Sequence, residues 1–284
     1  MLENVNHIVK LAKESNTSVI AFICMDHIMS RAVIEAAAST NTPALVMLYP
    51  EHASIQKTCT KAGFFQDVKS QAEQVSVPIG LHMDHDFSYE GILHTYQSGF
   101  RSMMFDGSMQ DLETNIALTK QVVSAFHPLG AVIEGEIGHV GLASDHAHET
   151  EDLFTKPEAA ARFCKETQVD LLAVSIGNAH GEYKSPPCLD LKRLEEIQAA
   201  VSTPLVLHGG SGIPDKQLLQ AFSRGIRKFN LGTEFLGKYH QALEEYAAEY
   251  SANPDPVKVI HMPDYVVDKL LPYVKNRLQV LCHF

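Results

Sequence analysis

The chain has 284 residues, of which 45% are hydrophobic and 20% charged, so it can bury a large core and its composition argues against disorder. Its formal net charge is −11 and it contains no basic run, which speaks against nucleic acid and anionic membranes as partners. The five cysteines form no CxxC pair and no framework spacing, as in cytosolic proteins whose thiols stay reduced.

The chain begins with an amphipathic stretch over residues 1–15, which lacks the basic start and apolar block of a signal peptide. No apolar run approaches the length of a membrane span, so we expect a soluble, cytoplasmic protein with no membrane partner. Farther along, apolar β-branched runs alternate with amphipathic stretches. The apolar runs predict strands at 19–23, 44–49, 78–83, 102–105, 131–136, 171–176, 204–207 and 228–231. The amphipathic stretches predict helices at 30–39, 59–74, 87–97, 112–126, 156–167, 191–200 and 215–224.

This alternation predicts a single (β/α)8 TIM barrel. A strand and a helix recurring about every thirty residues favour parallel pairing with right-handed crossovers, and eight such units fit a closed barrel. An open doubly wound sheet would need a glycine-rich G-x-G-x-x-G turn after its first strand, and Ile23-Cys24-Met25-Asp26-His27 is unlike one. No linker-like segment divides the chain, so residues 1–284 are interpreted as one domain. A helix at 264–281 forms a C-terminal extension, which we expect to pack on the barrel; an oligomer contact is the alternative.

Reactive side chains gather at the predicted carboxyl ends of the strands, which form the functional face of a barrel. The third strand ends in His82-Met83-Asp84-His85. In an extended strand His82 and Asp84 share a face, and His85 points elsewhere unless the strand has already stopped. A metal ligand beside a carboxylate that moves protons is the simplest chemical use of this cluster. A polar strand end without a metal is the alternative.

Three histidines at the ends of different strands, His85, His180 and His208, are candidates for binding one metal ion. Three imidazoles that leave one position open form the usual catalytic zinc arrangement. Each histidine alone is compatible with an ordinary loop residue, but all three at strand ends of one barrel favour the metal. Imidazole ligands suit cobalt, iron and nickel as well as zinc.

The segment His208-Gly209-Gly210-Ser211-Gly212 predicts an anion site. Glycines let backbone N–H groups approach an anion, and a helix starting near Asp215 would direct the positive end of its dipole there. Barrels often bind phosphate at the loops after strands seven and eight, where Ser211, Asn230 and Thr233 would add side-chain hydrogen bonds. A plain turn is the alternative.

Together these strand ends resemble the class II, metal-dependent aldolases of fructose and tagatose bisphosphate, especially the shorter tagatose-bisphosphate type. The resemblance runs through almost the whole chain and is weaker in the C-terminal tail. The motifs that carry it, in chain order, are His82-Met83-Asp84-His85, Phe105-Asp106-Gly107-Ser108, Glu134-Gly135-Glu136-Ile137-Gly138, Ser175-Ile176-Gly177-Asn178-Ala179-His180-Gly181, Leu207-His208-Gly209-Gly210-Ser211-Gly212 and Asn230-Leu231-Gly232-Thr233-Glu234.

The resemblance implies a lyase acting on a ketose 1-phosphate or ketose 1,6-bisphosphate, with dihydroxyacetone phosphate and an aldehyde as products and a zinc-stabilised enediolate between them. It implies one zinc ion per subunit, bound by His85, His180 and His208, with Asp84 as the catalytic proton-transfer residue. Another divalent ion and an additional monovalent cation are further cofactor candidates. A homodimer or homotetramer is the expected assembly.

The same resemblance assigns further binding positions. Asp106 and Glu136 match residues that line an alternative or inner metal position in the family. The residues expected to hold the phosphate of dihydroxyacetone phosphate are Gly181, Gly209, Ser211, Asn230 and Thr233.

The chain departs from the family pattern on the substrate side. A loop glutamate that exchanges a proton in the family is absent at Leu142-Ala143-Ser144-Asp145, and the candidates to replace it are Asp145, His146, His148 and Glu149. Ile23 stands where the family tends to have an asparagine, and Asp264 falls about where some members have an arginine for the distal phosphate. These changes predict a different aldehyde half, one without the second phosphate.

Two rival functions stay open at this point. A metal-dependent hydrolase would use zinc-bound hydroxide and needs no phosphate site. A catalytically weakened barrel kept for binding or assembly would explain the missing loop glutamate, although a complete histidine set argues against an idle scaffold.

Overall fold

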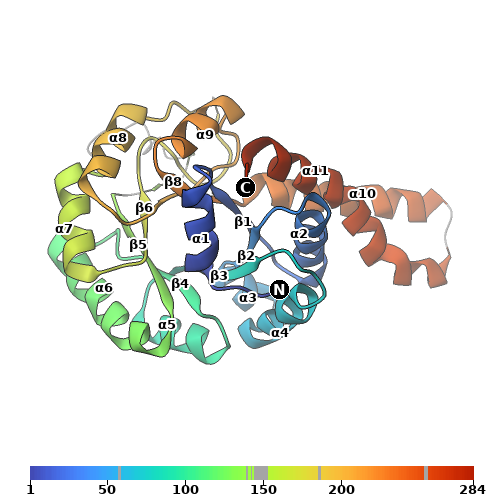
Figure 1. Ribbon diagram of the computed structural model, residues 1–284. Coiled ribbons are helices and arrows are strands. Elements are labelled where there is room, and N and C mark those ends of the chain that lie inside the picture. The colour runs from blue at the N-terminus through green and yellow to red at the C-terminus, as the bar shows by residue number, and fades with distance from the viewer. Residues whose placement is uncertain (57–58, 139, 142, 144–152, 185–186, 253–254) are drawn as a thin grey trace.

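The computed structural model describes residues 1–284 except 57–58, 139, 142, 144–152, 185–186 and 253–254. Within the described residues, eight parallel strands close into a barrel in the order β1-β2-β3-β4-β5-β6-β7-β8, so the predicted (β/α)8 fold is confirmed (Figure 1). The strands are β1 Val19–Ile23, β2 Ala44–Leu48, β3 Ile79–Asp86, β4 Ser102–Phe105, β5 Val132–Ile137, β6 Leu171–Val174, β7 Leu205–Leu207 and β8 Ile226–Leu231.

Most of the helices ring the barrel on the outside, and the first one lies across one end of it, as Figure 1 shows. They are α1 Val5–Glu14, α2 His27–Thr40, α3 Pro50–Gln56, α4 Lys61–Ala72, α5 Tyr89–Gln97, α6 Leu112–Phe126, α7 Pro157–Thr167, α8 Leu191–Ala200, α9 Asp215–Phe222, α10 Thr233–Ala252 and α11 Met262–Leu281, with short 3-10 helices at His127–Leu129 and Pro256–His261. Several begin at side chains that accept hydrogen bonds from the first turn, such as Asp26 before α2 and Ser88 before α5. No described helix is both long and apolar enough to cross a membrane.

The first helix closes one end of the barrel. Its buried residues Val5, Ile8 and Val9 belong to the same hydrophobic cluster as Val19, Leu45 and the other side chains that fill the barrel interior. The backbone N–H of Glu3 donates to the carbonyl of Ile79 at the start of β3, at 2.8 Å. The amphipathic pattern of residues 1–15 therefore reflects a helix that closes the barrel at the start of the strands, and the opposite end, where the strands finish, is not covered by this helix.

The chain ends in two long helices, α10 and α11, that extend sideways from the barrel (Figure 1). Helix α11 lies against α2 and buries Val266, Leu270 and Val274, so the apolar face expected of the C-terminal extension does pack on the barrel. Helix α10, which starts directly after β8, was not predicted from the sequence. Its first residue, Thr233, lies at the functional end of the barrel.

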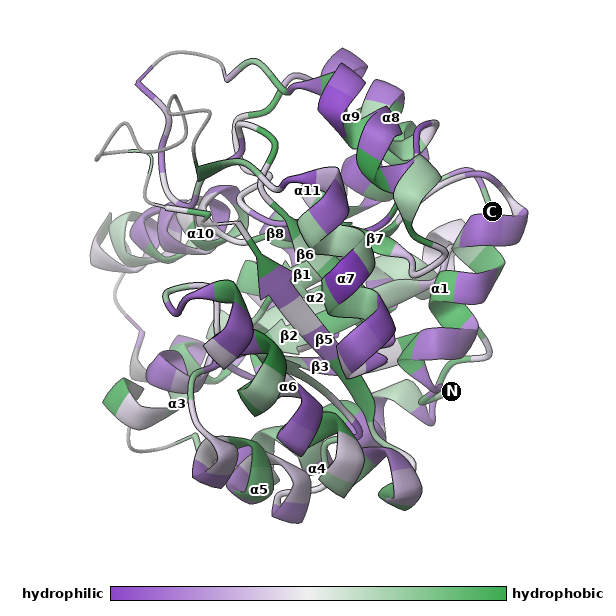
Figure 2. Cartoon of the chain, turned by 90° about the vertical axis from the view of Figure 1, so that its left-hand side faces the viewer, coloured by the Kyte–Doolittle hydropathy of each residue, from purple (hydrophilic) through white to green (hydrophobic). Residues whose placement is uncertain are grey.

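Charged side chains interrupt the apolar interior of the barrel. Figure 2 shows hydrophilic colour within β5, between hydrophobic segments. Glu134 on this strand is fully buried and lies 2.9 Å from the ammonium Nζ of Lys228 on β8, which is also fully buried. The Lys228 ammonium donates to Asn230 Oδ1 at 2.8 Å as well. The pair is needed because an isolated buried charge is strongly unfavourable.

We expect Lys228→Met to destabilise the protein by about 3–5 kcal/mol, because it leaves the Glu134 carboxylate buried without its cation. The free energy of unfolding, measured by urea denaturation with circular dichroism, tests this. Lys269→Met is the matched control: its partner Glu245 lies 2.7 Å away, but the side chains are 46% and 39% exposed. Such an exposed pair contributes little to stability, because solvent screens its charges. Equal stability of the two variants would contradict the expected role of Lys228.

Candidate active site

A cavity of about 570 Å³ opens at the carboxyl end of the barrel strands. All of the site residues expected from the sequence except His208 and Glu136 line it directly. These lining residues are Asp84, His85, Asp106, His180, Gly181, Gly209, Ser211, Asn230 and Thr233. His208 and Glu136 lie just beneath, with side chains that are 0% and 1% exposed. The structure thus brings together residues from β3, β4, β5 and β8 and from the loops after β6 and β7.

Strand β3 contains one extra residue at the site. Met83 pairs with Met103 and Asp86 pairs with Phe105, so three steps along β3 match two steps along β4. His85 lies in this β-bulge and has a φ of 29°, a left-handed conformation that costs a non-glycine residue roughly 1–3 kcal/mol. The bulge turns Asp84 and His85, which would point to opposite faces of a regular strand, toward the same cavity.

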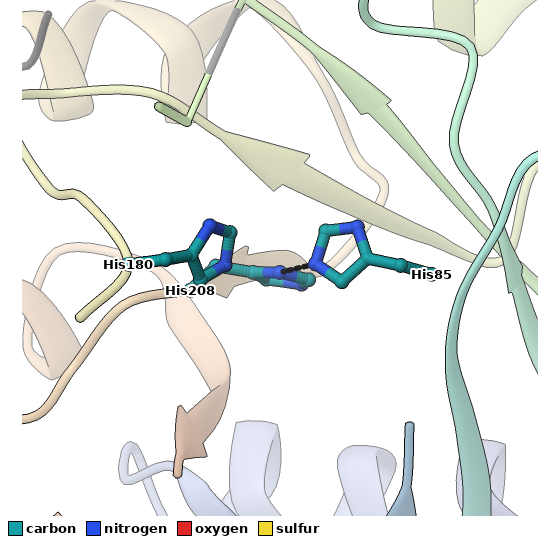
Figure 3. A group of neighbouring side chains, drawn as sticks. All are labelled: His85, His180 and His208. Carbon is teal, nitrogen blue, oxygen red and sulfur yellow. Dashed lines mark hydrogen bonds between the residues drawn. The ribbon is translucent and has the colours of Figure 1, made fainter. Parts of the chain in front are cut away.

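The three histidine rings converge, as Figure 3 shows. The Nε2 of His85 lies 3.0 Å from the Nδ1 of His208. The ring centroids of His85 and His180 are 5.1 Å apart, and those of His180 and His208 are 5.7 Å apart. One nitrogen from each ring falls within 4.8 Å of the others.

The neighbours of each ring determine which nitrogen faces the centre. His85 directs Nδ1 to Asp106 Oδ2 at 3.0 Å, and His180 directs Nδ1 to the Val140 carbonyl at 3.2 Å. His208 instead directs Nε2 to Glu134 Oε1 at 2.8 Å. When these nitrogens carry the proton, Nε2 of His85, Nε2 of His180 and Nδ1 of His208 present lone pairs to one point.

This donor set fits a divalent metal ion. Two imidazole nitrogens on one tetrahedral ion are about 3.3 Å apart, close to the separation between His85 and His208. Burial disfavours a charged His85, but Asp84, Asp106 and Glu136 outweigh it and raise the pKa of His85 to about 9. The surroundings that favour a proton on this ring favour a metal cation for the same electrostatic reason.

A second group of possible ligands lies deeper, where His85, Asp106 and Glu136 also bring one atom each within 4.8 Å. The Oε2 atom of Glu136 is buried and has no hydrogen-bond partner within the described part of the chain. Burial, followed by the nearby charge of Asp106, raises the pKa of Glu136 to about 8. A buried carboxyl oxygen without a described partner beside an imidazole is suited to bind a cation.

The glycine-rich loop after β7 is shaped for close approach of the backbone. Gly209 has a φ of 62°, and a Cβ there would meet the Ala179 carbonyl oxygen at 2.0 Å. A Cβ on Gly210 would meet the Phe229 ring at 1.8 Å. The Ser211 hydroxyl accepts a hydrogen bond from the Glu234 N–H in the first turn of α10, at 3.0 Å. Gly209, Gly210 and Ser211 of this loop and Thr233 at the start of α10 all line the cavity.

Much of the remaining lining is apolar. It includes Ile23, Phe87, Met109 and Leu236, together with the aromatic rings of Tyr49 and His52. No lysine or arginine is among the described residues that line the cavity.

Several of these positions were not expected from the sequence. Lys228 could have been noticed as a charge two residues before Asn230 on one strand face. Tyr49 and His52 follow β2 without any motif. Tyr183 was missed too: its hydroxyl accepts from Ala179 N–H at 2.6 Å and lies 2.9 Å from the Gly209 carbonyl oxygen, so it connects the β6 and β7 loops.

The loop expected to replace the family glutamate lies mostly outside the described residues. Ser144, Asp145, His146, His148 and Glu149 all fall there, so their role as acid-base candidates stays a prediction. Ala143 is described: it is buried, and its N–H donates to the His180 carbonyl at 2.8 Å. This bond joins the start of the loop to the segment that carries one of the three histidines.

Comparison with known proteins identifies the family. Residues 3–281 match the family model described as fructose-bisphosphate aldolase class-II. The YdjI aldolase from Escherichia coli K12 is similar to this chain, with 31% sequence identity, a TM-score of 0.85 and coverage of 99% of this chain and 98% of the other. A protein described as a fructose-1,6-bisphosphate aldolase from Coccidioides immitis has 25% identity, a TM-score of 0.86 and coverage of 98% and 96%.

A fructose-bisphosphate aldolase from Campylobacter jejuni, at 22% identity, shares the fold with a TM-score of 0.84 and coverage of 99% of this chain and 94% of the other. Because the family match spans nearly the whole chain, the resemblance seen in the strand-end motifs is confirmed. The chain belongs to the class II fructose-bisphosphate aldolase family, whose members are metal-dependent lyases.

Proposed function

We propose that this aldolase cleaves and forms a ketose 1-phosphate, with dihydroxyacetone phosphate and an aldehyde without a phosphate group as the two halves. The observation that carries the proposal is the meeting of His85, His180 and His208 beside Asp84, with the Gly209–Ser211 loop on one side of the same cavity. The hydrolase alternative is less well supported, because it gives no role to a loop shaped for phosphate. Cytoplasmic location and a homodimeric or homotetrameric assembly stay predictions.

His85, His180 and His208 would hold the metal ion, and zinc is the first candidate. A divalent ion bound there supplies Lewis-acid chemistry, in which it polarises the substrate carbonyl and stabilises the negative charge that develops as the C3–C4 bond breaks. Glu134 keeps the His208 ring oriented, and Asp106 does the same for His85. Asp106 and Glu136 are the proposed inner position of the ion.

Asp84 is the proposed proton-transfer residue. For cleavage, the C4 hydroxyl of the substrate must lose its proton, and a carboxylate at the wall of the cavity can accept it. Asp84 Oδ1 accepts a hydrogen bond from Asn230 Nδ2 at 3.1 Å and lies 3.9 Å from His85 Nε2. These contacts fix the carboxylate next to the ligand set, where the reacting hydroxyl would lie.

The phosphate of the dihydroxyacetone phosphate half would be held by Gly181, Gly209, Ser211, Asn230 and Thr233. Backbone N–H groups and the N-terminus of α10 would bind it in place of lysine or arginine. The aldehyde half would then lie against Ile23, Tyr49 and Leu236. A second phosphate there would lose its hydration without gaining a cation, which is why we propose an aldehyde that lacks one.

Asp84→Asn should leave the metal bound while lowering kcat at least about 100-fold, because general-base catalysis typically contributes that much or more. The release of dihydroxyacetone phosphate from phosphorylated ketoses measures turnover, and elemental analysis of the purified protein measures the metal. Asp170→Asn, on the other side of the barrel, serves as the control. A turnover close to that of the parent protein would remove Asp84 from the mechanism.

A chelator should abolish exchange of a C3 proton of dihydroxyacetone phosphate with solvent deuterium, and added zinc should restore it. This exchange, followed by proton NMR, tests carbanion formation without knowledge of the aldehyde. His208→Ala should lose the exchange, whereas His240→Ala, exposed on α10, should keep it. Exchange that persists after complete removal of metal would contradict the proposed use of the three histidines.

In the condensation direction, aldehydes without phosphate should be used with a higher kcat/KM than their phosphorylated counterparts. We expect the two kcat/KM values to differ at least about tenfold. A tenfold ratio corresponds to about 1.4 kcal/mol, the loss expected for a phosphate group that finds no partner in the site. Glyceraldehyde compared with glyceraldehyde 3-phosphate, at fixed dihydroxyacetone phosphate, is a direct measurement. Preference for the phosphorylated aldehyde would show that a cation outside the described lining reaches the substrate.

A further inference from the structure

The bulge in β3 raises the question of what holds it. His85 adopts a φ of 29°, and its ring is drawn toward the cavity by Asp106. The next residue, Asp86, is where the strand returns to its pairing with β4. Contacts of Asp86 therefore decide whether the backbone stays in the bulged form that directs both Asp84 and His85 inward.

Asp86 is held through its backbone and through its side chain. Its carbonyl accepts a hydrogen bond from the Asp106 N–H at 2.9 Å. Its carboxylate Oδ2 lies 3.4 Å from Lys61 Nζ on α4 and 3.5 Å from the Thr95 hydroxyl on α5. Lys61 also donates to Thr95 Oγ1 at 2.7 Å, which closes a triangle of polar contacts behind the sheet.

Two of the three residues are buried: Thr95 is 0% exposed and Asp86 is 7% exposed, whereas the side chain of Lys61 is 21% exposed. A Cβ on Gly91 would meet Asp86 Oδ1 at 1.8 Å, so a residue without a side chain is required in the first turn of α5. The carboxylate thus lies against the N-terminal turn of that helix, where the helix dipole favours negative charge.

We propose that Lys61, Asp86 and Thr95 form a positioning clamp, remote from the substrate, that holds the β3 bulge and with it the metal ligand His85. The clamp acts through the backbone. Because the Asp86 side chain is held outside the barrel between α4 and α5, the preceding residue of the bulge, His85, is directed toward the cavity. None of the three residues lines the cavity. The inference rests on the proposed metal site, because it concerns the geometry of one of its ligands.

Two substitutions at Thr95 separate the clamp from ordinary packing. Thr95→Val keeps the shape of the side chain and removes the hydroxyl, whereas Thr95→Ser keeps the hydroxyl and removes a methyl group. Titration of the metal-free protein with Co²⁺, followed by the visible absorption of the bound ion, measures affinity and ligand geometry. We expect Thr95→Val to bind Co²⁺ about 10–100-fold more weakly with an altered spectrum, as for other residues that orient metal ligands, and Thr95→Ser to resemble the parent protein.

Asp86→Asn and Lys61→Met test the other two residues of the clamp, and both should weaken Co²⁺ binding as Thr95→Val does. Thr167→Val is the matched control, because Thr167 is also buried in a helix, and its hydroxyl donates to the Phe163 carbonyl at 2.7 Å far from the site. Thr167→Val should leave the affinity and spectrum unchanged even where its thermal stability falls.

Parent-like Co²⁺ affinity and spectrum in both Thr95→Val and Asp86→Asn would overturn the clamp while leaving the proposed function intact. Weaker binding in Thr95→Ser than in Thr95→Val would also overturn it, because packing and not the hydroxyl would then govern the site. Parent protein that binds no Co²⁺ would contradict the proposed metal site itself, and the clamp with it.

Discussion

One extra residue in β3 is the constraint on which the site depends. A regular strand would send Asp84 into the barrel and His85 outward, so that the proposed proton-transfer residue and the proposed metal ligand could not face one cavity. The bulge turns both inward and leaves Asp86 to re-enter the sheet. His180, His208 and the glycine-rich loop follow strands β6 and β7, whose carboxyl ends already face the cavity. The strain at His85 is a local cost that surrounding contacts must offset.

The charged side chains inside the barrel are the second constraint on the site. Strand β5 contains two buried glutamates, Glu134 and Glu136, and they have different partners. Glu134 has Lys228 as its partner and orients His208. Glu136 forms no ion pair with a lysine or arginine among the described residues, and burial raises its pKa to about 8, a shift that a bound cation would oppose. The two carboxyls, two residues apart, are therefore suited to different tasks: one fixes a ligand and the other can receive an ion.

Much of this arrangement could be predicted, because most of the site residues lie at or just after the carboxyl end of a strand. In a parallel barrel all carboxyl ends meet, so motifs such as His82-Met83-Asp84-His85 and Leu207-His208-Gly209 locate the site once the strands are recognised. The bulge could not be predicted, because a period of two assigns His85 to the wrong face. The pairing of Lys228 with Glu134 depends on how β5 and β8 are placed relative to each other in the barrel. The hydrophobic pattern of one strand does not contain that information. Tyr49 follows β2 directly and His52 lies in the short helix α3, and neither position belongs to a motif. Helix α10 buries Phe235 and Ala242, which gives it a weak apolar pattern.

The Tyr183 hydroxyl links two of the loops that line the cavity. By bonding to the backbone at Ala179 and at Gly209, it joins the segment before His180 to the first residue of the glycine-rich loop. If the proposed phosphate binds the glycine-rich loop, the shared hydroxyl couples that loop to the segment before His180, and thermodynamic reciprocity requires any such effect to run both ways. Binding of the proposed phosphate would then favour binding of the proposed metal ion, and the metal ion would favour binding of the phosphate by the same factor.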